Sequence, residues 1–446
     1  MATIMKSINH GYNPFVKTAI CIALSGSMLA IAPAARADAI SDLKAQIDAL
    51  QKKFDELAAT QAAAAKAPPA PANVVTGGAT PGSFKLPGSD TSVTFGGYVK
   101  GDAIFSSKSA GTNSVGDQAL FPGLIPLTGD NEEKQLTLHA RQSRFNIKTD
   151  TPTAMGALST FLEFDLFGTD GNESASNSHN LRLRHAFGSL GGLLVGQTWS
   201  NFMDPGALPE TLDFGGPVGE MFVRQAQIRW TQAFAGGKWS VSLENPESIV
   251  ALPSGVGFRA DDDRIPDITG KIDFNTAKGR YSITGMARQI RLDSPAAPAA
   301  TTQKWGGVIG LNGVIPTTGK DDFRFSVNYG NVIGRYSGNG TAFRDGILDA
   351  NSNLDLPNQW GAIASYRHFW TSNLRSTVAL SGLGVSNPST AHGSLFKNAQ
   401  SAHLNLIWSP VAKTDLGIEY IHARREIQSG QSGNLNRLQA SAQYAF

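Results

Sequence analysis

Segments in which apolar and polar residues alternate run from about residue 84 to the end of the chain, and this period of two constrains the fold most strongly. We count about sixteen such segments, an even number, and the joins between them are alternately short and long. They lie near residues 91–105, 140–150, 155–168, 180–190, 192–201, 222–232, 237–246, 265–275, 279–291, 303–315, 321–331, 358–370, 373–385, 397–409, 413–425 and 434–446. Tight turns at one end and long loops at the other are typical of a transmembrane antiparallel β-barrel. The sequence therefore predicts an all-β fold of this kind over residues 84–446.

The alternation alone does not say which face meets water. In residues 323–329 the odd positions are apolar and the even positions are polar. A soluble sandwich would bury the apolar face, whereas a membrane barrel would expose that face to lipid and turn the polar face to the lumen. The two ends of the chain favour the barrel.

The last segment carries the alternation to the final residue. Positions 440 and 442 are small, and the aromatic residues Tyr444 and Phe446 follow in the same parity. This ending resembles the C-terminal insertion signal of Gram-negative outer-membrane barrels, in which a final Phe marks the last strand. The resemblance implies two partners, the lipid of the outer membrane and, during biogenesis, the barrel-assembly machinery.

Residues 1–37 have the pattern of a secretory signal peptide, with Met1 or Met5 as the start. Basic residues precede the apolar run 18–32, and small residues mark a cleavage point after it. The run is too short to span a membrane, and no later stretch approaches about 18 apolar residues, which excludes a helical membrane protein. The only cysteine, Cys21, lies in this segment, so we expect a mature chain without disulfides.

Charge and motif content narrow the class of function. Residues 1–37 hold three of the 38 basic side chains and none of the 36 acidic ones, which leaves 35 basic residues in the mature chain. This balance argues against a nucleic-acid partner. The histidines are scattered and no Gly-x-Ser-x-Gly turn occurs, so we expect neither an enzyme nor a cofactor or metal. A lipase-like outer-membrane enzyme and an envelope-tethering structural protein are the alternatives to a porin, and conductance in a planar bilayer separates the three.

Two further segments precede the predicted barrel. Apolar residues in 38–61 step by three and four, which predicts a helix with the heptad seam of a coiled coil. The seam consists of Ile40, Leu43, Ile47, Leu50, Phe54 and Leu57. We expect this coiled coil in the periplasm, with an amphipathic helix docked on its own protein as the alternative. Residues 62–83, rich in Ala, Pro and Gly, are a predicted linker.

Parity along the strands sorts the charged side chains. An Arg or Lys that faces lipid at mid-depth costs about 2–4 kcal/mol, so charged residues within the strands should face the lumen. The predicted basic lining is Lys100, Arg144, Lys148, Arg182, Arg184, Arg229, Arg288, Arg324, Arg367 and Arg375. Fewer acidic residues share this parity, which predicts a basic lumen and a preference for anions.

The third long loop, residues 202–221, is the candidate constriction. Its acidic residues are Asp204, Glu210, Asp213 and Glu220. If the loop folds inward, these acids would face Arg144, Arg182 and Arg184, and a transverse field would orient charged solutes. In the alternative the loop stays outside, and the three arginines pair with the acidic residues Glu163 and Asp165 of a neighbouring strand.

Four segments of the chain, Gly96–Lys100, Ala140–Phe145, Leu181–Phe187 and Gly196–Asp204, are together similar to one known family. In these segments and in its overall plan the chain resembles the DcaP-like family of trimeric Gram-negative outer-membrane porins. The resemblance covers essentially the whole mature chain. It implies a homotrimer and the passage of dicarboxylates and related small anionic solutes. The Ile/Leu seam by itself favours a dimer, but contacts between barrels should outweigh about three heptads of helix.

Overall fold

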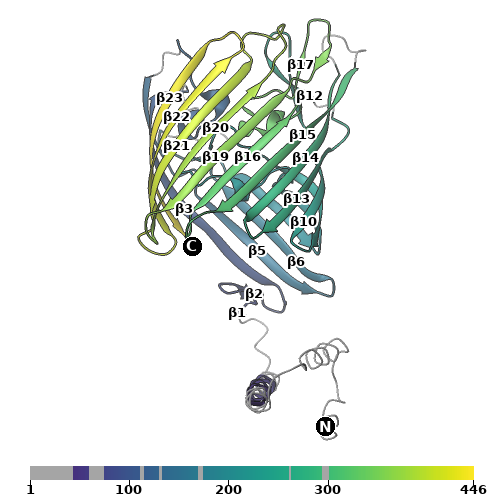
Figure 1. The fold of residues 1–446 in the computed structure, drawn as a ribbon, viewed down its shortest axis with the longest axis vertical. Helices are drawn as coiled ribbons and strands as arrows, with labels where there is room; N and C mark the ends of the chain where they lie inside the picture. Colours follow the sequence, from purple (N-terminus) through teal and green to yellow (C-terminus); the bar gives the residue numbers. More distant parts are fainter. Residues whose placement is uncertain are drawn as a thin grey trace, which may run out of the picture. The chain divides into compact units, whose positions relative to one another are not determined.

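The computed structural model describes residues 44–59, 75–110, 115–129, 133–168, 174–260, 263–293 and 301–446. The predicted signal peptide and the seam positions Ile40 and Leu43 lie outside these ranges. By its internal contacts the chain divides into two units, residues 1–74 and residues 75–446. The second unit is a β-barrel (Figure 1).

One continuous antiparallel sheet closes on itself to form the barrel (Figure 1). Its strands are β3 (Ser92–Lys108), β4 (Glu133–His139), β5 (Arg144–Thr153), β6 (Gly156–Asp165), β7 (Arg182–Leu190), β8 (Leu193–Trp199), β9 (Arg224–Phe234), β10 (Gly237–Glu244), β13 (Asp267–Thr276), β14 (Gly279–Asp293), β15 (Thr301–Pro316), β16 (Asp322–Gly330), β19 (Gln359–Phe369), β20 (Leu374–Val385), β21 (Phe396–Trp408), β22 (Thr414–Ile427) and β23 (Ser432–Ala445). Because β4 and β5 are two parts of one interrupted strand, the barrel has 16 strands. The last strand pairs with the first, from Arg437 opposite Ser106 to Ala445 opposite Tyr98. The predicted fold class and strand number are confirmed.

The long loops carry structure of their own. Four short strands from the fourth and sixth long loops form a second sheet, in which β11 and β17 pair in parallel. These strands are β11 (Ser248–Ala251), β12 (Gly257–Ala260), β17 (Gly346–Leu348) and β18 (Leu354–Asp355). The helical turns of the loops are α3 (Val115–Gln118), η1 (Pro122–Leu124), η2 (Pro205–Ala207), η3 (Gly334–Tyr336) and η4 (Gly338–Gly340).

Along the barrel strands apolar side chains are exposed and polar side chains are buried, the reverse of the pattern in a soluble protein. In β21 the apolar residues Leu404 and Trp408 are 53% and 47% exposed, whereas His403 and Asn405 are each 2% exposed. Exposing apolar surface to water costs about 25 cal/mol per Å², so this wall is stable only against lipid. Among the described residues, no helix combines the length and the apolar character needed to cross a membrane.

The second barrel strand departs from its predicted range of 140–150. It begins earlier, as β4, and bends at residues 140–143 before it continues as β5. Arg141 lies in this bend with its side chain buried, and its guanidinium donates to the carbonyls of Leu166 (3.2 Å) and Gly168 (3.0 Å). These bonds tie the bend to the residues that follow the third strand. Alternation of apolar and polar residues within a strand does not predict such a contact between separate segments.

A helix over residues 44–59 lies within the range predicted for it. Four positions of the predicted seam fall in it, and each is 51–67% exposed: Ile47, Leu50, Phe54 and Leu57. Within the stretch predicted to be a linker, β1 (Thr76–Gly77) pairs with β2 (Phe84–Lys85), which pairs with the start of β3. A short hairpin therefore leads into the barrel.

The largest buried apolar cluster lies where the long loops pack against the inside of the wall. It includes Phe202 and Met203 of the third loop together with Tyr336 and Phe343 of the sixth. Ile290 of β14 contributes from the wall. Packing of this kind fixes the loops inside the barrel, so they shape the space that a solute can enter.

Candidate functional site

The loop between β8 and β9, residues 200–223, runs along the inside of the barrel wall. It contacts β14 through Asp204, β16 through the carbonyl of Leu208, β20 through Glu210 and β23 through Asp213. These strands follow one another around one side of the barrel, and a single loop can reach their inward side chains only from within the lumen. The third loop therefore narrows the channel.

Three of the loop's four acidic residues bind the loop to this side of the wall. The ion pairs are Asp204 with Arg280 (2.8 Å), Glu210 with Arg375 (2.7 Å) and Asp213 with Arg437 (3.0 Å). Burial by itself raises the pKa of Asp204, but Lys271 and Arg280 outweigh it and hold the pKa of that carboxyl below its ordinary value. Each of these three loop carboxylates thus has a counter-charge on the wall.

An arginine cluster occupies the opposite side of the lumen, on β5 and β7. Arg182 and Arg184 each donate to Asp165, at 2.6 and 2.8 Å, and Arg184 also contacts Glu163 at 2.7 Å. Arg144 lies 3.6 Å from Glu163. The pairing register of β6 brings these acids between the two basic strands. Three guanidinium groups thus share two carboxylates.

Arg224 adds a fourth guanidinium to this cluster. It stands at the first residue of β9, where the third loop rejoins the wall, and it lies over the rings of Trp199 (4.6 Å) and Phe222 (5.2 Å). It forms no ion pair with any of the described residues. The parity of β9 alone would direct Arg224 outward, so the sequence pattern missed it. The sequence offers one indication of the position of Arg224: the aromatic residue Phe222, two positions earlier at the end of the loop, can pack against its guanidinium.

The face of the loop toward the cluster is aromatic. Phe214 and Phe222 pack edge to face with centroids 5.9 Å apart. The guanidinium groups of Arg182 and Arg184 lie 5.0 and 5.8 Å from the centre of the Phe214 ring. Guanidinium groups are attracted to such ring faces, which holds them in place without neutralising their charge.

Glu220, the remaining acidic residue of the loop, is buried and has no ion pair among the described residues. Burial raises its pKa well above the ordinary value, the nearby Asp213 carboxylate adds to this, and Arg224 opposes it. The raised pKa favours the neutral acid, so Glu220 contributes little negative charge to the passage.

The arrangement combines parts of both hypotheses that the sequence left open. The loop folds inward, but its acids pair with the far wall rather than with Arg144, Arg182 and Arg184. Those three pair instead with Glu163 and Asp165. The expected field between loop acids and these three arginines is therefore wrong in its details, because Asp204, Glu210 and Asp213 pair with arginines of the far wall.

Two of the predicted lining residues face inward but are covered by loops. Arg288 is fully buried and bonds to Asp345 of the sixth loop and, at 3.0 Å, to Asp267. Lys100 pairs with Asp102 at 3.0 Å and donates to the carbonyl of Leu212 in the third loop at 2.7 Å. Both cations fasten loops and cannot touch a solute, which corrects their predicted role.

Within the arginine cluster Arg184 is only 2% exposed, whereas Arg144 and Arg182 are partly exposed. The remaining predicted basic residues, outside the cluster, are partly or fully exposed. Arg324 and Arg367 share Asp322, near the tight turn before β16. Lys148 pairs with Asp150 at 2.9 Å, and Arg229 donates to Gln227 at 2.8 Å. They lie apart from the arginine cluster along the wall.

The chain end completes the wall. Tyr444 and Phe446 are exposed on the lipid side, at 55% and 50%, and the amide of Phe446 donates to the carbonyl of Gly97 at 3.1 Å. Gly97 has a φ of 149°, and a Cβ there would lie 2.2 Å from the carbonyl oxygen of Arg144. Only glycine fits this close approach at the seam of the barrel. The role of the terminal aromatics in insertion stays a prediction.

A cavity of about 380 Å³ adjoins the arginine cluster. Arg182, Arg224, Arg259 and Arg335 line it, and Glu247 is the one carboxylate among its described lining residues. No group of three or more His, Cys, Asp or Glu in the described ranges is placed to hold a metal ion. The approach to the narrow part of the lumen is thus positively charged.

A closed barrel with an apolar outer wall, a charged lumen and an inserted loop defines an outer-membrane channel of the porin type. Residues 28–446 match the family model described as DcaP outer membrane protein, and the chain belongs to this family. The family assignment suggested by the sequence is thereby confirmed, and it argues for a channel over an enzyme.

Solved structures share the fold. The outer membrane channel DcaP of Acinetobacter baumannii is 21% identical, with a TM-score of 0.70 over 83% of this chain and 100% of that one. OmpT of Vibrio cholerae is 10% identical, with a TM-score of 0.51 over 80% and 98%. An anion-selective porin from Comamonas acidovorans is 12% identical, with a TM-score of 0.50 over 80% and 100%. No match was found among curated protein sequences.

Proposed function

We propose that this channel lets small organic anions diffuse across the outer membrane and prefers dicarboxylates. The observation that carries the proposal is the charge of the arginine cluster. Four guanidinium groups, of Arg144, Arg182, Arg184 and Arg224, face two carboxylates, and the nearby loop acids are paired elsewhere or favoured as neutral. A net positive charge in a narrow aqueous passage raises the local concentration of anions.

The cluster suits a solute with two carboxylates. Arg224 has no protein counter-charge among the described residues, and Arg182 is partly exposed beside it in the same cavity. Each guanidinium can bind one carboxylate through two parallel hydrogen bonds, so a dicarboxylate can engage two arginines at once. The partly buried Phe222 ring, which lines the same cavity, offers an apolar surface to the carbon chain between the two carboxylates. Protein carboxylates compete for Arg182, which keeps binding weak enough for passage.

We also propose that three copies assemble, with the N-terminal helices in the periplasm as a coiled coil. The support is the resemblance of the chain to trimeric porins and the exposed seam of the helix, with Leu50 and Leu57 each 67% exposed. A helix of this length is marginal on its own in water, and pairing its apolar stripe between chains would stabilise it.

Single-channel recording in a planar bilayer tests the proposal. Succinate should cause transient current interruptions, acetate should cause far fewer, and the double variant Arg182→Ser, Arg184→Ser should shorten the succinate dwell times. Lys278→Gln, on an exposed tight turn far from the cluster, removes one charge elsewhere and is the matched control. Equal interruptions with succinate and acetate would contradict the preference for dicarboxylates, and absence of conductance would contradict a channel.

A further inference from the structure

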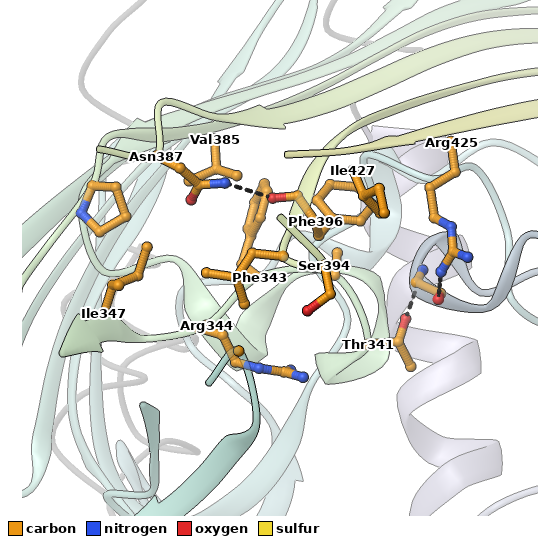
Figure 2. A pocket seen from close by; sticks show the side chains of 15 residues that line it. Thr341, Phe343, Arg344, Ile347, Val385, Asn387, Ser394, Phe396, Arg425 and Ile427 are labelled. Carbon is orange, nitrogen blue, oxygen red and sulfur yellow. Dashed lines mark hydrogen bonds between the residues drawn. The ribbon is translucent and has the colours of Figure 1, made fainter. Parts of the chain in front are cut away.

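A second cavity, of about 120 Å³, lies among the long loops (Figure 2). The first, fourth, sixth and seventh loops line it together with the outer ends of β20, β21 and β22. None of its described lining residues belongs to the third loop or to the arginine cluster. It is therefore a separate feature of the outer mouth.

One part of this cavity is apolar. Phe343 and Phe396 pack edge to face, with centroids 5.7 Å apart and an interplanar angle of 79°, and Ile347, Val385 and Ile427 surround them (Figure 2). An apolar cavity of about 150 Å³ in another protein holds benzene. The present volume is slightly smaller, but exposed Ser394 at its edge leaves an opening through which part of a ligand can protrude. The space thus suits one ring-sized apolar group.

The other part is positively charged. Arg344 makes no ion pair or side-chain hydrogen bond with any of the described residues, and it lines the cavity together with Ser394 (Figure 2). Arg425 lines the opposite end and donates to the carbonyl of Gly123. The described lining residues include no Asp or Glu. Because Arg344 has no counter-charge in contact with it, this end of the cavity favours an anion.

The nearest acid in the sequence, Asp345, does not fill this role. Its carboxylate accepts from Arg288 and, at 2.7 Å, from the amide of Ile249. Burial lowers the pKa of Arg344, and Asp345 offsets only part of this effect. A half-buried guanidinium without a contacting counter-charge is well placed to bind a carboxylate.

We propose that this cavity is a binding site for a monocarboxylate carried on a ring-sized apolar body, of which benzoate is the simplest probe. Arg344 binds the carboxylate, and the ring lies against Phe343, Phe396 and Ile347. The site is distinct from the dicarboxylate passage, since it offers one accessible guanidinium and a closed apolar end. The proposed binding of a monocarboxylate at this site does not depend on the anion preference proposed for the lumen.

The test is direct binding of benzoate to the purified full-length protein, measured by isothermal titration calorimetry, with acetate and benzamide as partial mimics. Benzoate should bind more tightly than either, because acetate lacks the ring and benzamide lacks the charge. Arg344→Gln should weaken benzoate binding about 10- to 100-fold, the range expected for a lost hydrogen bond to a charged group. Arg424→Gln is the matched control, since Arg424 neighbours Arg425 in β22 but faces the outside of the wall and is exposed.

A second variant keeps the test decisive if Arg344→Gln perturbs the loops. Val385→Phe fills the apolar end and leaves Arg344 in place, so it should also abolish benzoate binding. The double variant Arg182→Ser, Arg184→Ser should bind benzoate as the unmodified protein does. Benzoate binding that survives both Arg344→Gln and Val385→Phe, or that is lost in the double variant, would overturn the proposal and place the anion in the lumen.

Discussion

Replacing Arg224 by Gln removes the one guanidinium of the arginine cluster that has no protein carboxylate beside it. The cluster holds four positive charges against Glu163 and Asp165, so the change lowers its net charge from about two to about one. The rings of Trp199 and Phe222 can still pack around the amide, and no ion pair between described residues is lost. The variant therefore isolates charge from folding better than any substitution at Asp165's partners.

The expected effect follows from Coulomb's law. At about 5 Å, one unit charge changes the energy of a monovalent ion by about 0.8 kcal/mol in a water-like dielectric and by about 3 kcal/mol at an effective dielectric constant of 20. The lower value already corresponds to about a fourfold change in the local concentration of anions, since about 1.4 kcal/mol is tenfold. Arg224→Gln should thus lower the anion-to-cation permeability ratio at least about fourfold at low salt, and less at high salt because of screening.

The assay is the reversal potential across a planar bilayer in a potassium chloride gradient. The potential should move toward cation preference for Arg224→Gln and stay unchanged for Lys278→Gln, which removes the same charge from a distant turn. A reversal potential equal in the unmodified protein and in Arg224→Gln would refute the reasoning, because it would mean that this guanidinium does not face the permeating ions.

Three further predictions concern the loop acid, the topology and the helix. Because the pKa of Glu220 is raised, its carboxyl ionises only as the pH rises above the ordinary range for Glu, so anion preference should fall toward alkaline pH in the unmodified protein and remain flat in Glu220→Gln. Selectivity that follows pH equally in both proteins would remove Glu220 from the passage. A cysteine at Ser254 in the fourth long loop should react with a membrane-impermeant reagent on intact cells, and one at Thr276 in a tight turn should not, whereas equal labelling would contradict the orientation. Changing Ile47 and Leu50 to Asp should weaken the oligomer on native gels without loss of conductance, and an unchanged oligomer would argue against a coiled coil.

The barrel could be predicted from the sequence because each of its signals is local. Alternation within a strand and the lengths of adjacent joins need no knowledge of distant contacts. The path of the third loop could not be predicted in this way, because it depends on ion pairs between residues far apart in the sequence. Glu210 pairs with Arg375, which lies 165 positions later, and Asp213 pairs with Arg437, which lies 224 positions later. No spacing in one sequence selects such partners among the many basic residues of the same parity.

Parity is also an incomplete guide where an inserted loop packs against the wall. It assigned Lys100 and Arg288 to the lumen correctly, yet it could not show that the third and sixth loops cover them. The parity of β9 would direct Arg224 outward, but its guanidinium lies over the rings of Trp199 and Phe222 and lines a cavity together with Arg182. The residues that differ from the prediction are therefore those within reach of an inserted loop.

The position of the loop's ion pairs explains how a nearly neutral chain can present a basic passage. Asp204, Glu210 and Asp213 fasten the loop to the wall from β14 to β23, and each neutralises a cation there. Toward the arginine cluster the loop presents Phe214 rather than an acid, and a cavity lined by Arg182 and Arg224 adjoins the cluster. Had the acids faced Arg182 instead, the same residues would have cancelled the charge that attracts a solute. The anion preference proposed for this barrel thus depends less on how many charged residues line the lumen than on which side of the lumen the acids of the third loop bind.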